Sequence, residues 1–571
     1  MAQMPPIIAS FIREFAEKND LSELPVSKQF EHLLGQLLFR ESIHGRFRTA
    51  DVITGKGETG IDGACVVLDR NLILTEEDVT QYLSNRASSS AVVELVFFQG
   101  KTSQQFLREE ILGFGDAILE LLHEDDSVTP QDSYLNEIAR IYRTLLQYAA
   151  KLDLKRASCR AYFCCLGEWK NASHPAAALK KLQGRIQELK FFSSVQALPI
   201  DRNDVRRYWN DSTRSQEATL PTVARFPFPA MPGVNNAVVA LVRAQDFVDK
   251  IIRDETGKVR IGIFDQNIRD FEGESNPVNQ KIVSTITKPD TKRRFGIMNN
   301  GVTVVAKEMK SAADNYILRN YQIINGCQTS NVLERSREHL TPDILLQVRL
   351  IETTESNVLD DVVEATNSQT AVQQHQFAAN RGLAVETQEF FRSYPVDPSY
   401  RLHFERRTSE FADASLKNTR IVTIPDLARS FGAIFLEEPH HVASAPNQAF
   451  SIFQDRLFRD VDSPMMYYSS AFAYYRLSLL KVSGRLKIPH HRLYWHVLTA
   501  ARWLSAGKLP SDQSRRKKDQ HCEKFLAQLW DPSHALSLFE QAYRAIQDHT
   551  TQIDRDRLRR QTFTNEYLSK L

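Results

Sequence analysis

The most constraining feature of the sequence is an almost uninterrupted apolar stretch, AVVELVFFQ, at residues 91–99. A half-exposed strand alternates apolar and polar side chains, whereas a strand covered on both faces has a nearly continuous apolar run. Stretches with helical periodicity lie nearby, such as 28–41, whose apolar residues recur at three- and four-residue spacing. The pattern therefore predicts an α/β (α+β) fold in which helices flank a mixed sheet.

Other N-terminal segments agree with this fold class. The stretches 63–69 and 71–75 are short, apolar and separated by one residue, which predicts two strands of a hairpin. Longer stretches at 104–123 and 133–151 have the spacing of amphipathic helices. We expect them to cover the sheet.

The length of 571 residues predicts roughly three to five structural units. The proline-rich segment FPFPAMPG cannot occupy a central strand or a helix interior, so a boundary is expected near 218–235. We predict an N-terminal domain at 1–220, a central α/β domain at 235–445 and a mainly helical region at 446–571.

Composition excludes several classes of protein. A hydrophobic content of 42% and a charged content of 25% are ordinary for a soluble domain. No apolar run approaches the roughly 20 residues that cross a bilayer, and the N-terminus does not resemble a secretory signal, so we expect a cytoplasmic protein without membrane contact. The six cysteines form no zinc or disulfide pattern. The net charge of +2 neither requires nor excludes nucleic-acid binding.

Polar residues that could carry chemistry stand at the ends of two predicted strands. Asp62 lies between glycines in Gly60-Ile61-Asp62-Gly63, just before the first hairpin strand. Gln99 and Lys101 end the apolar strand, and the two-residue period places both on one face. Taken singly, the aspartate is explained by a turn, and the lysine by a side chain that reaches solvent. Their combination suggests a site.

This combination resembles the PD-(D/E)xK restriction endonuclease superfamily, in the Mrr-like variant that has glutamine in place of the last acidic residue. The family also has an acidic residue on the helix before the sheet, and Glu31 in KQFEHLLGQLL stands in that context. The resemblance implies a nuclease that depends on Mg²⁺ or Mn²⁺, and a homodimer with paired active sites.

The residue types suit phosphodiester hydrolysis, which uses a hard cation held by oxygen ligands. Asp62 would be the central ligand, and Glu31 would supply a second carboxylate. Gln99 could bind only through its neutral carbonyl oxygen. Lys101 would position the attacking water and stabilise developing negative charge. Glu58 is a reserve ligand.

A second set of motifs lies in the middle of the chain: NNGVTVVA, QIINGCQTSNVL, ATNSQTAV and FERR. Each alone is explained by tight turns and helix caps, because Asn-Gly favours turns and threonine or serine caps helices. Together they resemble the AIPR family, named for abortive infection and phage resistance, over roughly 235–440. The resemblance implies a cytoplasmic role in anti-phage defence.

A strand that enters a helix through Asn-Gly-x-Gln-Thr presents amide groups and a helix N-terminus, which can hold an anion. We therefore expect the central domain to bind a phosphate-bearing ligand, either a nucleotide or nucleic acid, and to gate the nuclease. Its trigger would be a nucleotide or a phage-derived molecule. The candidate residues are Asn300, Asn325, Gly326, Gln328, Thr329, Asn367 and Arg406.

The sequence leaves several functions open. We favour a nuclease acting on DNA rather than RNA. The alternatives are a non-catalytic nucleic-acid or nucleotide sensor subunit of a defence complex, and a toxin-like RNase. The basic runs 515–518 and 555–560 are more typical of solvated helix surfaces than of segments that contact phosphate.

Overall fold

A computed structural model describes most of the chain, which divides into two compact units. The described residues are 4–43, 45–54, 60–84, 90–123, 133–213, 216–255, 257, 259–260, 263–264, 277–355, 358–359, 361–362, 365, 382–406, 410–411, 416–509, 514–550 and 552–571. The first unit comprises Met1–Ser212, Phe377–Arg407 and Phe411–Leu571, and the second comprises Thr213–Gln376 and Thr408–Glu410.

The first unit contains a five-stranded mixed sheet in the order β2-β1-β3-β4-β5. Its strands are β1 (Gly63–Leu68), β2 (Asn71–Ile73), β3 (Val93–Lys101), β4 (Ser158–Cys165) and β5 (Ser194–Ile200). β1 runs antiparallel to β2 and β3, as the predicted hairpin requires, while β3, β4 and β5 are parallel. The apolar run at 91–99 thus lies in β3, the central strand of the sheet.

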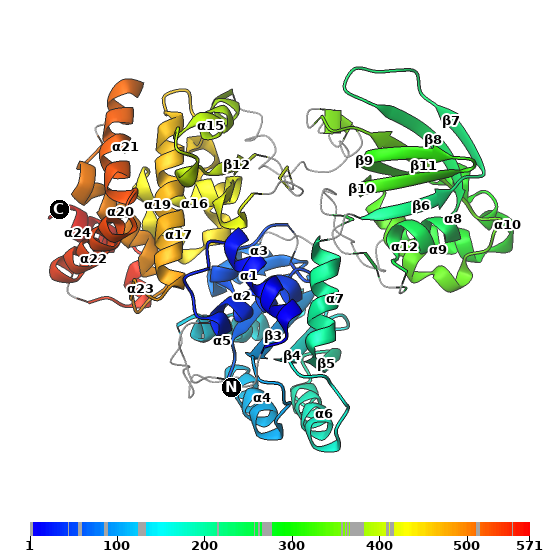
Figure 1. Ribbon diagram of the computed structural model, residues 1–571, viewed down its shortest axis with the longest axis horizontal. Helices are drawn as coiled ribbons and strands as arrows, with labels where there is room; N and C mark the ends of the chain where they lie inside the picture. The colour runs from blue at the N-terminus through cyan, green and yellow to red at the C-terminus, as the bar shows by residue number, and fades with distance from the viewer. Residues whose placement is uncertain are drawn as a thin grey trace. The chain divides into compact units, whose positions relative to one another are not determined.

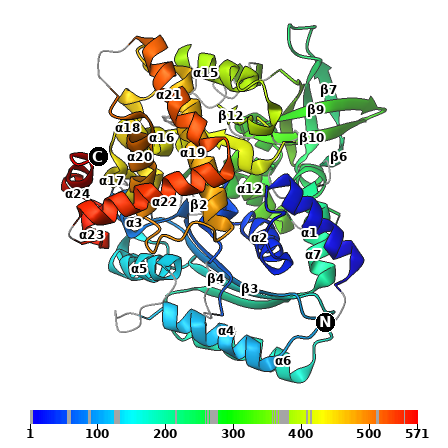
Figure 2. The same ribbon diagram turned by 60° about the vertical axis from the view of Figure 1, so that its left-hand side comes forward.

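Helices cover both faces of this sheet (Figure 2). One face packs against α1 (Pro6–Lys18), α2 (Val26–Phe39) and α7 (Arg202–Thr213), and the other against α4 (Arg108–Leu121), α5 (Ser133–Gln147) and α6 (Ser173–Gln187). Val96 and Phe98 of β3 point into the first layer, and Leu95 and Phe97 into the second. The two-sided cover explains the unbroken apolar run, and it confirms the predicted fold class.

The remainder of the first unit is mainly helical, as predicted for its part from residue 446 onward (Figure 1). Its elements are α15 (Gly382–Ser393), β12 (His403–Glu405), β13 (Ile421–Thr423), α16 (Ile424–Ile434), α17 (Pro439–Ser444), α18 (Ala449–Phe453), α19 (Pro464–Val482), α20 (Leu493–Ala506), α21 (Arg515–Leu529), α22 (Pro532–His549), α23 (Arg555–Leu558) and α24 (Gln561–Leu568). α19 is buried on almost every side, which agrees with a sequence whose apolar residues are spread around the helix rather than gathered on one face. The predicted border at 445–446 lies within this unit.

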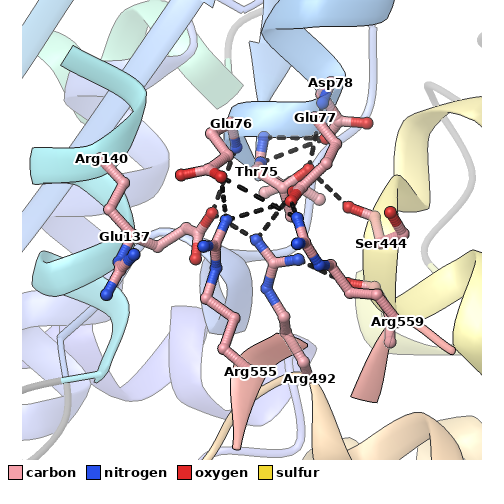
Figure 3. Close-up of polar contacts among 12 residues, drawn as sticks. Thr75, Glu76, Glu77, Asp78, Glu137, Arg140, Ser444, Arg492, Arg555 and Arg559 are labelled. Atoms are coloured by element: carbon pink, nitrogen blue, oxygen red, sulfur yellow. Dashed lines mark hydrogen bonds and ion pairs between the residues drawn. The ribbon is translucent and has the colours of Figure 1, made fainter. Parts of the chain in front are cut away.

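A cluster of charged side chains joins the N-terminal sheet region to these C-terminal helices (Figure 3). Nη2 of Arg492 lies 2.6 Å from Oε1 of Glu137 on α5 and 2.9 Å from Oε2 of Glu77 on α3 (Glu76–Ser84). Arg555 and Arg559, from the basic run near the C-terminus, also pair with Glu77. These arginines therefore bind carboxylates of the N-terminal region inside the unit.

Further ion pairs connect the same two parts of the chain. Asp20, after α1, pairs with Lys417 and Arg420, and the hydroxyl of Tyr475 donates to its carboxylate over 3.0 Å. A side-chain hydrogen bond also joins them, in which Nδ2 of Asn447 donates to the carbonyl of Leu72 over 2.6 Å. The N-terminal 212 residues and the C-terminal helices thus form one folded body.

We predict that Arg492→Met destabilises the first unit by about 3–5 kcal/mol, because it leaves Glu77 and Glu137 buried without their main cation. Only 3% of the Arg492 side chain is exposed. The control is Arg515→Met, because Arg515 pairs with Glu386 and both side chains are nearly half exposed. That change should cost about 0–1 kcal/mol. Equal shifts of the urea denaturation midpoint for the two variants would contradict the role of the cluster.

The C-terminal helices also bury His496, whose ring lies between two polar partners. Nε2 donates to the carbonyl of Leu558 over 2.9 Å, and Nδ1 lies 3.2 Å from the hydroxyl of Tyr567, from which it can accept. Burial lowers the pKa of His496 from 6.5 to about 3. Burial also lowers the pKa of His440 and His521 to about 4.

We expect the first unit to lose stability as the pH falls below about 6.5, because protons bind these histidines more readily in the unfolded chain. When folding lowers the pKa of a histidine, its contribution to stability is complete at a pH above the pKa of the unfolded chain. The contribution is lost as the pH falls toward the pKa of the folded protein. His496→Gln should therefore show a smaller drop in urea midpoint between pH 7.5 and pH 5 than the wild type. His174→Gln, at an exposed position of α6, is the control. An unchanged drop in His496→Gln would refute this prediction.

The second unit is built on a six-stranded sheet in the order β6-β10-β9-β11-β8-β7. The strands are β6 (Glu217–Pro221), β7 (Ala224–Pro227), β8 (Asn236–Arg243), β9 (Val302–Ala312), β10 (Asn315–Asn325) and β11 (Leu345–Glu352), and the helices are α8 (Ala244–Asp246), the π-helical η3 (Phe247–Ile252), α9 (Pro277–Thr287), α10 (Pro289–Lys292), α11 (Phe295–Met298) and α12 (Cys327–Arg335). The helices pack on one face of the sheet. Part of FPFPAMPG forms β7 at the edge, where a proline is tolerated.

Across the described ranges of both units, no helix combines the length and the apolar character needed to cross a membrane.

Candidate functional site

The end of β3 is the point where the predicted nuclease residues meet. Gly63 of β1 lies opposite Phe98 of β3, and the N–H of Asp62 donates to the carbonyl of Phe98 over 3.0 Å. The N–H of Gly100 donates to Oδ2 of Asp62 over 2.8 Å. The carboxylate of Asp62 is therefore held against the last residues of β3.

Gln99 and Lys101 lie on the same face of β3, as their spacing predicts. Gln99 is only 6% exposed, and its Oε1 accepts no hydrogen bond from the residues that the structure describes. A buried amide oxygen without a donor carries a desolvation penalty of about 1–3 kcal/mol. Such an oxygen is suited to accept a cation or a water. Lys101 is half-buried, so its ammonium group can reach both the site and solvent.

Glu31 approaches the site from α2, on the other side of the sheet. Its side chain is almost fully buried, and Oε2 lies 2.6 Å from Nζ of Lys28. Burial raises the pKa of Glu31 to about 7, and the negative charge of Asp62 adds to this increase. Lys28 and Lys101 oppose it. The structure thus brings Glu31, Asp62 and Lys101 within electrostatic reach of one another.

The close approach of α2 depends on Gly100. A Cβ atom at this position would lie 2.7 Å from Cδ1 of Leu34 and 3.8 Å from the ring of Phe30. Both side chains belong to α2 and are buried. The glycine between Gln99 and Lys101 therefore lets the helix that carries Glu31 pack directly on the end of β3.

Asp62 is also partly withdrawn from solvent. Burial raises the pKa of its carboxyl, while the Gly100 N–H and the charges of Lys28 and Lys101 lower it. Two carboxylates and two ammonium groups therefore share the site. The two ammonium groups favour the ionised carboxylates and offset part of the effect of burial, while the pKa of both carboxyls stays above its ordinary value.

Two residues at the site were not predicted. Lys28 precedes Glu31 by one helical turn, a spacing that was visible in the sequence. Glu110 of α4 has Oε1 4.0 Å from Nζ of Lys101, and its Oε2 is buried without a hydrogen-bond partner among the described residues. No sequence signal indicated Glu110, because its approach depends on how α4 packs on β3. Glu58 lies outside the described residues.

The donor set fits a hard divalent cation. Carboxylate and amide oxygens are the ligands that Mg²⁺ and Mn²⁺ prefer. Glu31 and Asp62 supply carboxylates, and Gln99 supplies an amide oxygen that has no hydrogen-bond donor among the residues the structure describes. Within the described part of the chain, no three His, Cys, Asp or Glu side chains gather in a metal-binding group. Any metal held here would thus depend on the glutamine or on substrate oxygens.

The motifs of the second unit meet at one end of its sheet. Nδ2 of Asn299 donates to Oγ1 of Thr329 over 3.1 Å, and Oδ1 of Asn299 accepts from the N–H of Gly301 over 2.8 Å. Gln328 accepts from Asn279 of α9 over 3.0 Å. These contacts tie the NNG turn to the start of α12. They give Thr329 and Gln328 a structural role.

Gly326 explains why the second motif contains Asn-Gly. Its φ of 91° lies in the left-handed region, directly before α12. A Cβ atom there would lie 3.0 Å from the carbonyl oxygen of Gly301 and 2.8 Å from Cγ2 of Val302. The two glycine turns therefore pack against each other.

The remaining candidates of this set are dispersed. Asn300 is exposed, and Asn325 ends β10. Arg406 belongs to the first unit, where its Nε donates to Oε1 of Gln388 over 3.4 Å. Asn367 lies outside the described residues. The expected phosphate site stays a prediction.

Comparison with known proteins bears on this part of the chain. The family model of the AIPR protein matches residues 264–551. The chain belongs to the AIPR family. Membership implies a role in anti-phage defence. No curated protein and no solved structure matches the chain.

The AIPR match begins inside the second unit and extends into the C-terminal helices of the first. It includes the NNG and NGCQT turns and leaves out the end of β3 with its carboxylates. The assignment of the N-terminal site therefore rests on its own residues and geometry.

We predict that Asn299→Ala and Thr329→Val destabilise the second unit by about 1 kcal/mol each, the usual value of a hydrogen bond. Because the two side chains bond to each other, the double variant should lose less than the sum of the single losses. Urea denaturation of the three variants measures the coupling. Strictly additive losses would mean that the contact does not stabilise the fold.

Proposed function

We propose that this AIPR protein is a metal-dependent nuclease that hydrolyses phosphodiester bonds, with DNA as the favoured substrate. The observation that carries the proposal is the convergence of Glu31, Asp62 and Lys101 at the end of β3, beside the buried amide oxygen of Gln99, which accepts no hydrogen bond within the described part of the chain. The arrangement has the residue types and chain order of the Mrr-like nucleases that the sequence resembles.

Glu31, Asp62 and Gln99 would hold Mg²⁺ or Mn²⁺, which would polarise the phosphate and make the attacking water more acidic. The backbone of Gly100 orients Asp62 through its N–H. Lys101 offsets the negative charge that develops on the phosphate. Glu110 positions the Lys101 ammonium from the side of α4.

The family setting supplies the biological context of the proposal. In anti-phage defence, a nuclease site would act by damaging nucleic acid once infection is sensed. In this proposal the second unit senses a nucleotide or a phage-derived trigger and gates cleavage. The non-catalytic sensor and the RNase remain the alternative outcomes of the test below.

The test is cleavage by the purified full chain with Mg²⁺ or Mn²⁺. Supercoiled plasmid, linear DNA and RNA serve as substrates. We expect Lys101→Ala to lose roughly 10²–10³-fold in rate, because it removes a charge that stabilises the transition state. Asp62→Asn should lose at least as much, because it removes a ligand charge while keeping the side-chain shape. Direct conversion of supercoiled plasmid to linear product would support paired sites in a homodimer, whereas nicked circles indicate a single site.

The control is Lys181→Ala, which removes a lysine from an exposed position of α6. It should cleave as the wild type does. Cleavage that survives both site substitutions would place the chemistry elsewhere. RNA cleavage alone would support the RNase instead, and binding of nucleic acid without cleavage, with and without a nucleotide added, would support the sensor.

A further inference from the structure

Lys28 occupies a position in the site that the proposed reaction does not explain. It lies one helical turn before Glu31 on α2, with Nζ 2.6 Å from Oε2 of that carboxylate. Its charge also acts on Asp62, whose pKa it lowers. One ammonium group therefore serves both of the carboxylates that would bind the metal.

The contact differs from an ordinary pair on a helix surface. Glu14 and Lys18 of α1 form such a pair, and about half of each side chain is exposed. At the site, only 8% of the Glu31 side chain is exposed, while 29% of Lys28 is. The carboxylate is fixed and needs a cation, whereas the lysine has a flexible stem and a route to solvent.

The charge balance gives this contact a consequence for metal binding. Lys28 pairs with Glu31, Lys101 lies 4.0 Å from Glu110, and Gln99 is neutral. A divalent cation that bound Glu31 while Lys28 stayed in place would lie close to the lysine ammonium group and would be repelled by it. Binding is therefore opposed unless Lys28 withdraws or a phosphate supplies negative charge.

We propose that Lys28 is a positioning residue that acts as an internal counter-ion for Glu31 and must release it before Glu31 can bind a metal. The inference rests on the proposed nuclease function and deepens it. In the metal-free protein the lysine holds the place of the cation. When nucleic acid is bound, the released ammonium group can pair with a backbone phosphate, so metal and nucleic acid bind cooperatively.

The first experiment measures Mn²⁺ binding by calorimetry without nucleic acid. Lys28→Met should bind Mn²⁺ roughly tenfold more tightly than the wild type, which is within the range by which outer residues alter metal affinity. Lys28→Arg keeps the charge and should not show the gain. Lys18→Met removes the equivalent lysine of the exposed pair and should match the wild type. Lys28→Gln provides a second neutral variant if Lys28→Met does not fold.

The second experiment tests the coupling. It repeats the titration with a short DNA duplex in the Lys101→Ala background, in which cleavage is slow. Addition of duplex should tighten Mn²⁺ binding more when Lys28 is present than in the Lys28→Met variant. Only in the protein with Lys28 must the metal displace an ammonium group from Glu31, and a duplex phosphate can pair with that group.

Unchanged or weaker Mn²⁺ affinity in both neutral variants would overturn the role of Lys28, and the nuclease proposal would stand if the wild type still cleaves. Absence of both Mn²⁺ binding and cleavage in every protein, with or without duplex, would overturn both proposals. A gain that persists in the double variant Lys28→Met, Glu31→Gln would show that the effect does not act through Glu31, and would also reject the inference.

Discussion

The first unit depends on neutralising buried carboxylates with cations from other parts of the chain. Arg492 binds Glu77 and Glu137, and Arg48 lies 3.4 Å from the carboxylate of Asp426. Both pairs use arginine, whose planar, always charged group makes several fixed hydrogen bonds, whereas Asp20 pairs with both Lys417 and Arg420. The carboxylates at the end of β3 have lysines instead. In the proposed function, these lysines are the charges that a metal and a phosphate would replace.

How well each part of the structure could be predicted depends on how far apart in the sequence the interacting residues lie. The apolar run of β3, the hairpin partner β1 and the stripe of α2 are local patterns, and they correctly predicted the strands that bring Asp62, Gln99 and Lys101 together. Packing between distant elements has no such pattern. The basic run near the C-terminus was interpreted as a helix surface, but Arg555 and Arg559 point toward Glu77 (Figure 3). Glu110 escaped prediction for the same reason.

The second unit shows how one motif can suggest a ligand and serve the fold. The Asn325-Gly326 turn before α12 was interpreted as an anion site, and in the neighbouring NNG turn Asn299 uses its amide to bridge Gly301 and Thr329. Gly301 and Gly326 are required by the contact between their turns. Polar residues that hold turns in place in this way cannot be distinguished from ligand-binding residues by their spacing in the sequence alone. Stability measurements separate them, because a residue that only binds ligand costs the fold little when it is removed.

The division of the chain changes how the nuclease proposal must be tested. The second unit is inserted between the N-terminal sheet region and the helices that pack against it. A fragment that ends near residue 220 would lose Arg492, Arg555 and Arg559 and would leave Glu77 and Glu137 without their cations. An inactive fragment would then report a misfolded sheet rather than a degenerate site. The site at the end of β3 is therefore a property of the whole first unit, and substitutions in the full chain are the informative experiment.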